Sequence, residues 1–124
     1  MFGQQGKKKE FLLEAKDIRP LVNTQMGCIA TDRITVDGKR VGFCYREKTD
    51  GTHPDTGWRF FAGDESDEYL DNPDNSSVFC LNTIANYDRD ILPLLDSPAG
   101  TAFFRDPETG DFVLDAEWME GQFD

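Results

Sequence analysis

From residue 26 onward, short β-rich segments separated by turn residues dominate the chain, and this pattern restricts the fold more than any other feature. Apolar and polar residues alternate with a period of two in 26–36 and again in 40–47, and the aromatic segment 58–63 also has the composition of a strand. The dipeptide Asp37-Gly38, between the first two segments, is typical of a hairpin turn. The sequence therefore predicts a first hairpin from these two segments and a further strand at 58–63.

Two stretches instead repeat apolar residues every three or four positions, which is the spacing of one face of a helix. The first runs from Phe11 to Val22, where Pro20 is placed to end it. The second begins at Asn82 or Thr83 and reaches Leu94 or Leu95. We expect an N-terminal helix from the first stretch and one longer helix from the second.

Shorter elements complete the order of the chain. A helical turn is expected at 65–70, a short strand at 77–82, and a second hairpin whose strands 100–105 and 112–114 flank a Pro- and Gly-containing turn. Strands joined by hairpins, with only one long helix between them, favour an α+β domain. We therefore expect a mainly antiparallel sheet of about five strands with the two helices packed on it. Residues 1–124 are expected to form a single domain, with flexible ends at 1–9 and 117–124.

Charge is distributed very unevenly along the chain. The 124 residues carry 24 acidic and 13 basic groups, a net charge of −11, and residues 63–124 alone hold sixteen acidic and two basic residues, a net charge of −14. Such a field repels nucleic acid phosphates and anionic lipid headgroups and attracts a basic protein. We expect no nucleic acid and no membrane partner. The alternative is that the acidic residues only keep the protein soluble.

The N-terminal region and the cysteines indicate a cytoplasmic protein. The apolar run at Phe11 to Leu13 is only three residues long, too short for a signal peptide or a membrane span. Cys28, Cys44 and Cys80 are odd in number, and each lies within an apolar run. We therefore expect three reduced cysteines in the core.

The sequence contains no recognisable catalytic motif. His53 is the only histidine, and neither a nucleophile elbow nor an HExxH pattern accompanies it. The glycines form no phosphate-binding loop. We therefore predict a protein that is not an enzyme and has no cofactor. A small hydrolase stays as a third class only if the fold brings Cys44, His53 and an aspartate together.

Carboxylates are concentrated in the acidic segment, residues 64–77, and continue to residue 90. Hard cations such as Ca²⁺ prefer several oxygen ligands. The segment that starts at Asp71 does not match an EF-hand loop, because Pro73, Ser76 and Asn82 occupy the third, sixth and twelfth positions of that motif. We predict no metal site, although a weak divalent-cation site stays open as the alternative to a solvated acidic face. The carboxylates concerned are Asp64, Glu65, Asp67, Glu68, Asp71, Asp74, Asp88 and Asp90.

The densest acidic segment lies next to two aromatic residues, Trp58 and Tyr69. Aromatic anchors combined with charge are typical of protein-binding surfaces, although packing of both rings in the core is the alternative. The candidate partner-binding residues are Asp55, Trp58, Asp64, Glu65, Asp67, Glu68, Tyr69 and Asp71.

Several motifs together resemble a known family. They are the run Ala30-Thr31-Asp32, the segment 42–47, the segment 55–65 with Tyr69 after it, and the segment 81–87. Over about residues 26–115 they look like the bacterial immunity protein 33 family, first catalogued as domain of unknown function 2185. The resemblance implies immunity against polymorphic toxins and supplies no catalytic residues.

Structural roles are also expected for some motif residues. Arg46 and Arg59 are expected near Asp55 and Glu65, with at least one charge-assisted pair between the loop and the sheet. The segment 82–87, with Asn82, Asn86 and Tyr87, is expected to cap or buttress the second helix against the same loop.

We therefore expect a cytoplasmic binding protein that neutralises a toxin, most simply a basic toxin domain, through an acidic surface. The alternative is a regulatory module that binds a small ligand or a divalent cation, using the loop 49–58 and the cluster 64–71. Strand order and oligomeric state stay open.

Overall fold

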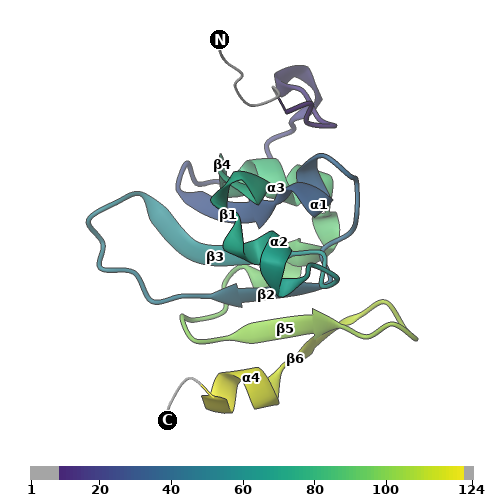
Figure 1. Cartoon of the computed structure of the whole chain (residues 1–124). Helices are drawn as coiled ribbons and strands as arrows, with labels where there is room; N and C mark the ends of the chain where they lie inside the picture. Colours follow the sequence, from purple (N-terminus) through teal and green to yellow (C-terminus); the bar gives the residue numbers. More distant parts are fainter. Residues whose placement is uncertain (1–8, 122–124) are drawn as a thin grey trace.

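The computed structural model describes residues 9–121, in which six strands form one sheet in the order β4-β1-β3-β2-β5-β6 (Figure 1). Only β1 and β3 are parallel, and the other neighbours are antiparallel. The strands are β1 (Gly27–Thr31), β2 (Phe43–Arg46), β3 (Asp55–Phe61), β4 (Ser76–Cys80), β5 (Ala102–Arg105) and β6 (Phe112–Leu114). The α-helices are α1 (Asp32–Thr35), α2 (Asp67–Asp71), α3 (Leu81–Tyr87) and α4 (Ala116–Gly121), and the 3-10 helices are η1 (Ala15–Asp17), η2 (Pro73–Asn75) and η3 (Arg89–Leu94).

The predicted α+β class is confirmed, with six strands rather than about five. The short strand after the acidic segment is β4, which pairs along its whole length with β1. The second hairpin is also confirmed as β5 and β6. Its turn is closed by the amide of Asp106, which donates to the carbonyl of Asp111 at 2.8 Å.

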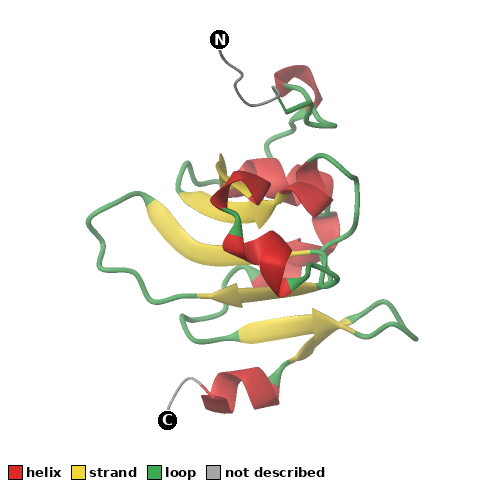
Figure 2. Ribbon diagram, viewed as in Figure 1, coloured by secondary structure: helices red, strands yellow, loops and turns green. Residues whose placement is uncertain are grey.

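The core lies between one face of the sheet and the pair α3 and η3. Trp58 and Phe60 of β3 are fully buried there and stack with ring centroids 5.9 Å apart. Ile84 of α3 and Ile91 of η3 cover them from the helical side. Burying an aliphatic or aromatic side chain of this kind stabilises the fold by about 1.5–3 kcal/mol. In Figure 2, α3 lies behind the sheet and α2 lies in front of it, so the two helices are on opposite faces.

The predicted first hairpin is wrong. After β1 the chain enters the short helix α1, and the amide of Gly38 donates to the carbonyl of Ile34 at 3.2 Å, so Asp37-Gly38 ends this helix rather than closing a hairpin. Gly38 has a φ of +80°, the left-handed conformation that glycine favours at the end of a helix. β1 therefore pairs with β3 and β4, and β2 pairs with β3 and β5.

The predicted N-terminal helix is also wrong. Between residues 9 and 26 only the three-residue turn η1 is helical. The backbone of this segment is bonded to distant groups instead: the amide of Leu12 donates to the carbonyl of Thr35, and the amide of Leu13 donates to the Tyr87 hydroxyl at 3.0 Å. Because these tertiary hydrogen bonds satisfy the backbone, the local helical spacing does not decide its conformation.

The predicted longer helix is divided into α3 and η3 at Asp88. Asp88 has an extended backbone, with φ −150° and ψ 100°, and its side chain accepts a hydrogen bond from the amide of Asp90 at the start of η3. The residue therefore ends one helix and caps the next.

Two of the three cysteines lie in the core, as expected, and Cys80 does not. Burial raises the pKa of the Cys28 and Cys44 thiols to about 12 each. Cys80 is exposed on the edge strand β4, because the face of that strand turned away from α3 is open to solvent.

The ends of the chain are only partly described. The expected flexible ends fall outside the described residues at 1–8 and 122–124, while residues 116–121 form α4. None of the helices between residues 9 and 121 has the length and apolar character needed to cross a membrane.

Candidate functional site

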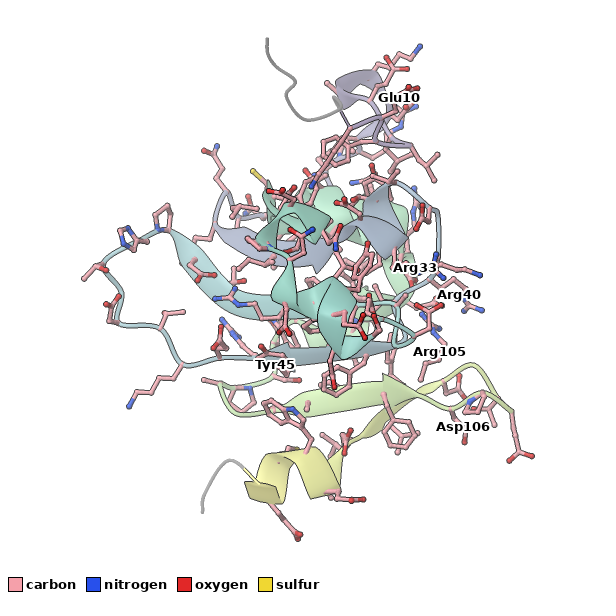
Figure 3. The ribbon with its side chains drawn as sticks, in the orientation of Figure 1. Glu10, Arg33, Arg40, Tyr45, Arg105 and Asp106 are labelled. Atoms are coloured by element: carbon pink, nitrogen blue, oxygen red, sulfur yellow. The ribbon has the colours of Figure 1, made fainter. Side chains whose placement is uncertain are left out.

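The face of the sheet opposite the core carries a row of aromatic side chains. Successive residues of a strand point to opposite faces, so the burial of Cys44 and Phe60 in the core places their neighbours Phe43, Tyr45 and Phe61 on the other side. Tyr45 and Phe61 stack with centroids 5.8 Å apart and an interplanar angle of 14°, and Phe43 lies 5.8 Å from Phe61. In the view of Figure 3, Tyr45 is labelled beside β2, below α2.

These rings form part of a groove of about 610 Å³ between the sheet and α2. Tyr69 and Leu70 of α2 line one side of it, and both are at least partly accessible to solvent. Beside the groove, Trp118 of α4 packs on Tyr45 with centroids 4.7 Å apart. The remaining lining residues are Ile29, Thr31, Phe43, Glu47, Arg59, Phe60, Phe61, Gly63, Glu65, Asn72, Asn75 and Ser76.

Arg59 lies in the groove wall and is neutralised by two carboxylates. Its Nη2 lies 2.7 Å from Oδ2 of Asp55, and its Nε lies 2.7 Å from Oε2 of Glu47. The hydrogen bonds from Arg59 hold the pKa of the Asp55 carboxyl below its usual range. The expected charge-assisted pair is therefore formed by Arg59, whereas the Arg46 side chain donates to backbone carbonyls, including that of Ser97.

A bulge at Gly57 brings Asp55 within reach of Arg59. The three residues of β1 from Gly27 to Ile29 lie opposite the five residues of β3 from Asp55 to Arg59. Gly57 has a φ of +91°, and a Cβ there would lie 2.1 Å from the carbonyl oxygen of Glu47. Only glycine fits this position, so the bulge and the charged cluster depend on it.

Glu65 positions α2 over the groove rather than facing a partner. Its carboxylate accepts hydrogen bonds from the Thr31 hydroxyl at 2.6 Å and from the amides of Ala62 and Gly63 at 2.8 and 2.9 Å. These bonds hold the turn between β3 and α2. The Ser66 side chain then accepts from the amide of Tyr69 and caps α2.

The structure separates the predicted partner-binding residues into three groups. Asp55, Asp64 and Glu65 are engaged within the fold, Asp64 through an ion pair with Arg33. Trp58 is fully buried, so the alternative of core packing describes it and it does not reach the surface. The remaining residues, Asp67, Glu68, Tyr69 and Asp71, lie together on α2.

The carboxylates of α2 are the open part of this surface. Asp67, Glu68 and Asp71 are exposed, and their side chains form no ion pair or hydrogen bond within residues 9–121. Three such charges on one short helix, next to an aromatic groove, give a site suited to a cationic partner.

The other predicted sites are not assembled. In the part of the chain that the structure describes, no group of three or more His, Cys, Asp or Glu side chains is placed to hold a metal ion. Cys44 is fully buried on the core face, whereas His53 is exposed in the loop after β2, so the fold does not create the Cys44 and His53 arrangement.

The segment 81–87 also acts differently from the expectation. Oδ1 of Asn82 accepts hydrogen bonds from the amides of Leu21 and Val22, both at 2.8 Å, and Asn86 bonds both backbone groups of Arg19. These side chains hold the N-terminal segment against α3, not the loop that precedes β3.

The comparison with family models decides what kind of domain this is. The description "Immunity protein Imm33 domain" matches residues 28–115, which is most of the chain. The chain belongs to the Imm33 family. The match includes β1 to β6 and α2, so the groove is part of the Imm33 domain, while α4 and the N-terminal segment lie outside it. Comparisons with curated proteins and with solved structures found no match.

The groove was missed at the level of sequence, although a signal for it was present. Phe43, Tyr45 and Phe61 alternate with core residues, so both faces of β2 and β3 are apolar. A strand with two apolar faces indicates that both sides are covered or used. The α3 side is covered by the core, and the α2 side is the groove.

Proposed function

We propose that this Imm33 domain is a cytoplasmic immunity protein without enzymatic activity that neutralises a toxin by binding it directly. Family membership supports an immunity role. The single observation that supports direct binding is the pairing of three exposed carboxylates on α2 with the aromatic groove below them. An interface of this type combines charge for the encounter with apolar area for affinity.

The expected partner is a basic toxin domain. Residues 63–124 carry a net charge of −14, and most of the cations near α2 are already paired: Arg33 with Asp64 and Asp37, and Arg59 with Asp55 and Glu47. The field at this face is therefore negative, which accelerates association with a basic protein at low salt. Raising the ionic strength from about 0.01 to 0.15 M shortens the Debye length from about 30 to 8 Å and slows that association.

The test is coexpression with the toxin gene encoded next to this one. We expect growth to be restored, and the purified proteins to form a complex with a Kd below about a micromolar. Replacing Asp67, Glu68 and Asp71 by Lys reverses three charges and is expected to lower the association rate by at least about tenfold at low salt.

A matched triple variant controls for overall charge. Asp96, Glu108 and Asp111 are exposed and lie outside the α2 face, so changing them to Lys alters the net charge by the same amount. The control is expected to keep most of the binding. If both triple variants lose affinity equally, net charge and not the α2 face controls binding. If no neighbouring toxin is neutralised or bound, the immunity proposal fails.

The groove volume supports one second candidate, a regulatory module that binds a small ligand. A volume of about 610 Å³ is within the range of about 300–1,000 Å³ found for small-molecule sites. A thermal-shift screen of metabolites tests this candidate, since a ligand bound at 100 times its Kd adds about 2.7 kcal/mol of stability. The absence of any shift would count against it.

A further inference from the structure

The groove beside α2 has the chemistry of a site for one cationic side chain. Its floor is the stacked pair Tyr45 and Phe61, with Tyr69 at its side. Aromatic faces attract guanidinium and ammonium groups, more strongly where water is partly excluded.

Arg59 does not give the groove the character of an anion site. Four hydrogen bonds leave its guanidinium: one to Glu47, two to Asp55 and one to the carbonyl of Trp58. A guanidinium has only five N–H groups, so little donor capacity is left for a further anion. The two negative charges of Asp55 and Glu47 outweigh the single positive charge of Arg59.

Glu47 supplies an acceptor next to the aromatic floor. Glu47 directly follows β2, and its amide continues the pairing with β3 by donating to the carbonyl of Gly57 at 2.8 Å. Glu47 therefore points to the same side as Tyr45, and both line the groove. Only Oε2 of Glu47 is bonded to Arg59, and Oε1 accepts no hydrogen bond from the residues between 9 and 121. The Glu47 side chain is 49% exposed, so an incoming cation can reach it.

The same fold already packs guanidinium groups on rings. Cζ of Arg105 lies 4.3 Å from the centroid of Phe112 on the other face of the sheet. The Tyr45 and Phe61 stack has no such cation above it among the described residues. Aromatic rings and an open carboxylate oxygen thus face one space, and α2, which lines this space through Tyr69 and Leu70, also carries three exposed carboxylates.

We propose that this groove receives an arginine side chain of the partner protein, stacked on Tyr45 and Phe61 and hydrogen-bonded to Glu47. This inference rests on the proposed function, because it takes the toxin as the partner that presents the arginine. The α2 carboxylates then attract the basic surface around that residue.

The test is a titration of the full ¹⁵N-labelled chain with two acetylated, amidated tripeptides, triarginine and tricitrulline. Citrulline has nearly the same shape as arginine but no charge. We expect the arginine peptide to shift the amide signals of Tyr45, Phe61 and Tyr69 and to bind at least about tenfold more tightly than the citrulline peptide. Equal affinities, or shifts confined to Asp67, Glu68 and Asp71, would overturn the proposal.

Variants then locate the contact. Glu47→Gln and Tyr69→Leu are each expected to weaken triarginine binding by about threefold to tenfold, while the exposed control Glu108→Gln leaves it unchanged. Glu47→Gln also weakens the ion pair between Glu47 and Arg59. Tyr69 lies on a surface helix and takes no part in that pair, so Tyr69→Leu tests the groove independently. Unchanged binding by both variants would refute the groove site.

The same variants separate this inference from the proposed function. If Tyr69→Leu and Glu47→Gln neutralise the neighbouring toxin as well as the unmodified protein does, the groove inference fails and direct neutralisation stands. If triarginine binds in the groove but no toxin is neutralised, the groove stands and the immunity proposal fails.

Discussion

Removing the Asp88 carboxylate is the most informative single change to the fold. Asp88 is only 7% exposed, and its Oδ2 accepts from the buried amide of Val41 at 2.9 Å and from Nη2 of Arg105 at 2.7 Å. Its Oδ1 accepts from the amide of Asp90. Asp88→Ala therefore removes the acceptor of the buried Val41 N–H and of Nη2 of Arg105, and it leaves the exposed Asp90 as the one carboxylate bonded to this guanidinium among the described residues.

The magnitude follows from the burial of both partners. The Arg105 side chain is 10% exposed, and breaking a buried ion pair by removing one partner costs about 3–5 kcal/mol. A protein of this size has a total stability of about 5–15 kcal/mol. The expected fall in the melting temperature is about 10–20 °C.

Asp90→Ala is the matched control. Arg40 and Arg105 lie side by side (Figure 3), and both bond Asp90, at 2.8 and 3.0 Å. The Asp90 side chain is 54% exposed, so solvent screens these pairs and their loss costs at most about 1 kcal/mol.

Urea unfolding followed by circular dichroism measures both variants. We expect Asp88→Ala to lower the free energy of unfolding at least three times as much as Asp90→Ala. Adding Arg105→Met to Asp88→Ala is expected to recover part of the loss, because the guanidinium that has lost its buried carboxylate partner is then replaced by an apolar side chain. Equal effects of the two aspartate variants would refute the argument that burial sets the energy.

Three further changes test the local arguments. Gly57→Ala is expected to destabilise the fold by more than about 3 kcal/mol in urea unfolding, because its Cβ would lie 2.1 Å from a backbone oxygen. Gly100 is the matched control: it also has a positive φ, +92°, but a Cβ there would meet no atom within 4 Å, so Gly100→Ala is expected to cost about 1 kcal/mol. Asn82→Ala removes two acceptor bonds to the N-terminal segment and is expected to speed proteolysis there without unfolding the sheet. At pH 8 a thiol reagent should label Cys80 rapidly and Cys28 and Cys44 only on unfolding, since the pKa values of about 12 keep the two buried thiols protonated. Labelling of all three cysteines at one rate would contradict the burial of Cys28 and Cys44 in the core.

The pKa shifts of the two buried thiols also fix a pH window. The folded state favours the protonated form of each thiol, so the preference adds to the stability of the fold in full at pH values below the unfolded pKa of 9.0. It is lost as the pH rises toward about 12.

Local sequence patterns predict an element correctly where the interactions that stabilise it join residues close in the chain. The β5 and β6 hairpin follows from the turn residues between its strands, and α2 follows from the Ser66 cap and the acidic first turn. The α+β class, the negative charge after residue 62 and the family resemblance are equally properties of the sequence.

Tertiary structure decided the elements whose partners are far away. The hairpin signal at Asp37-Gly38 ends α1 instead, because β1 pairs with β3 and β4, which lie more distant in the chain than β2. The apolar spacing of 11–22 did not make a helix, because Asn82, Asn86 and Tyr87 bind its backbone.

The candidate site divides in the same way. Its exposed carboxylates on α2 and Tyr69 beside them were readable in the sequence, because acidic residues without nearby cations stay in solvent. The aromatic floor was not, because Tyr45 and Phe61 come together only when β2 and β3 pair and α2 folds back over them. Composition and turn chemistry thus set the class and the charge, while strand pairing over long distances in the chain created the groove.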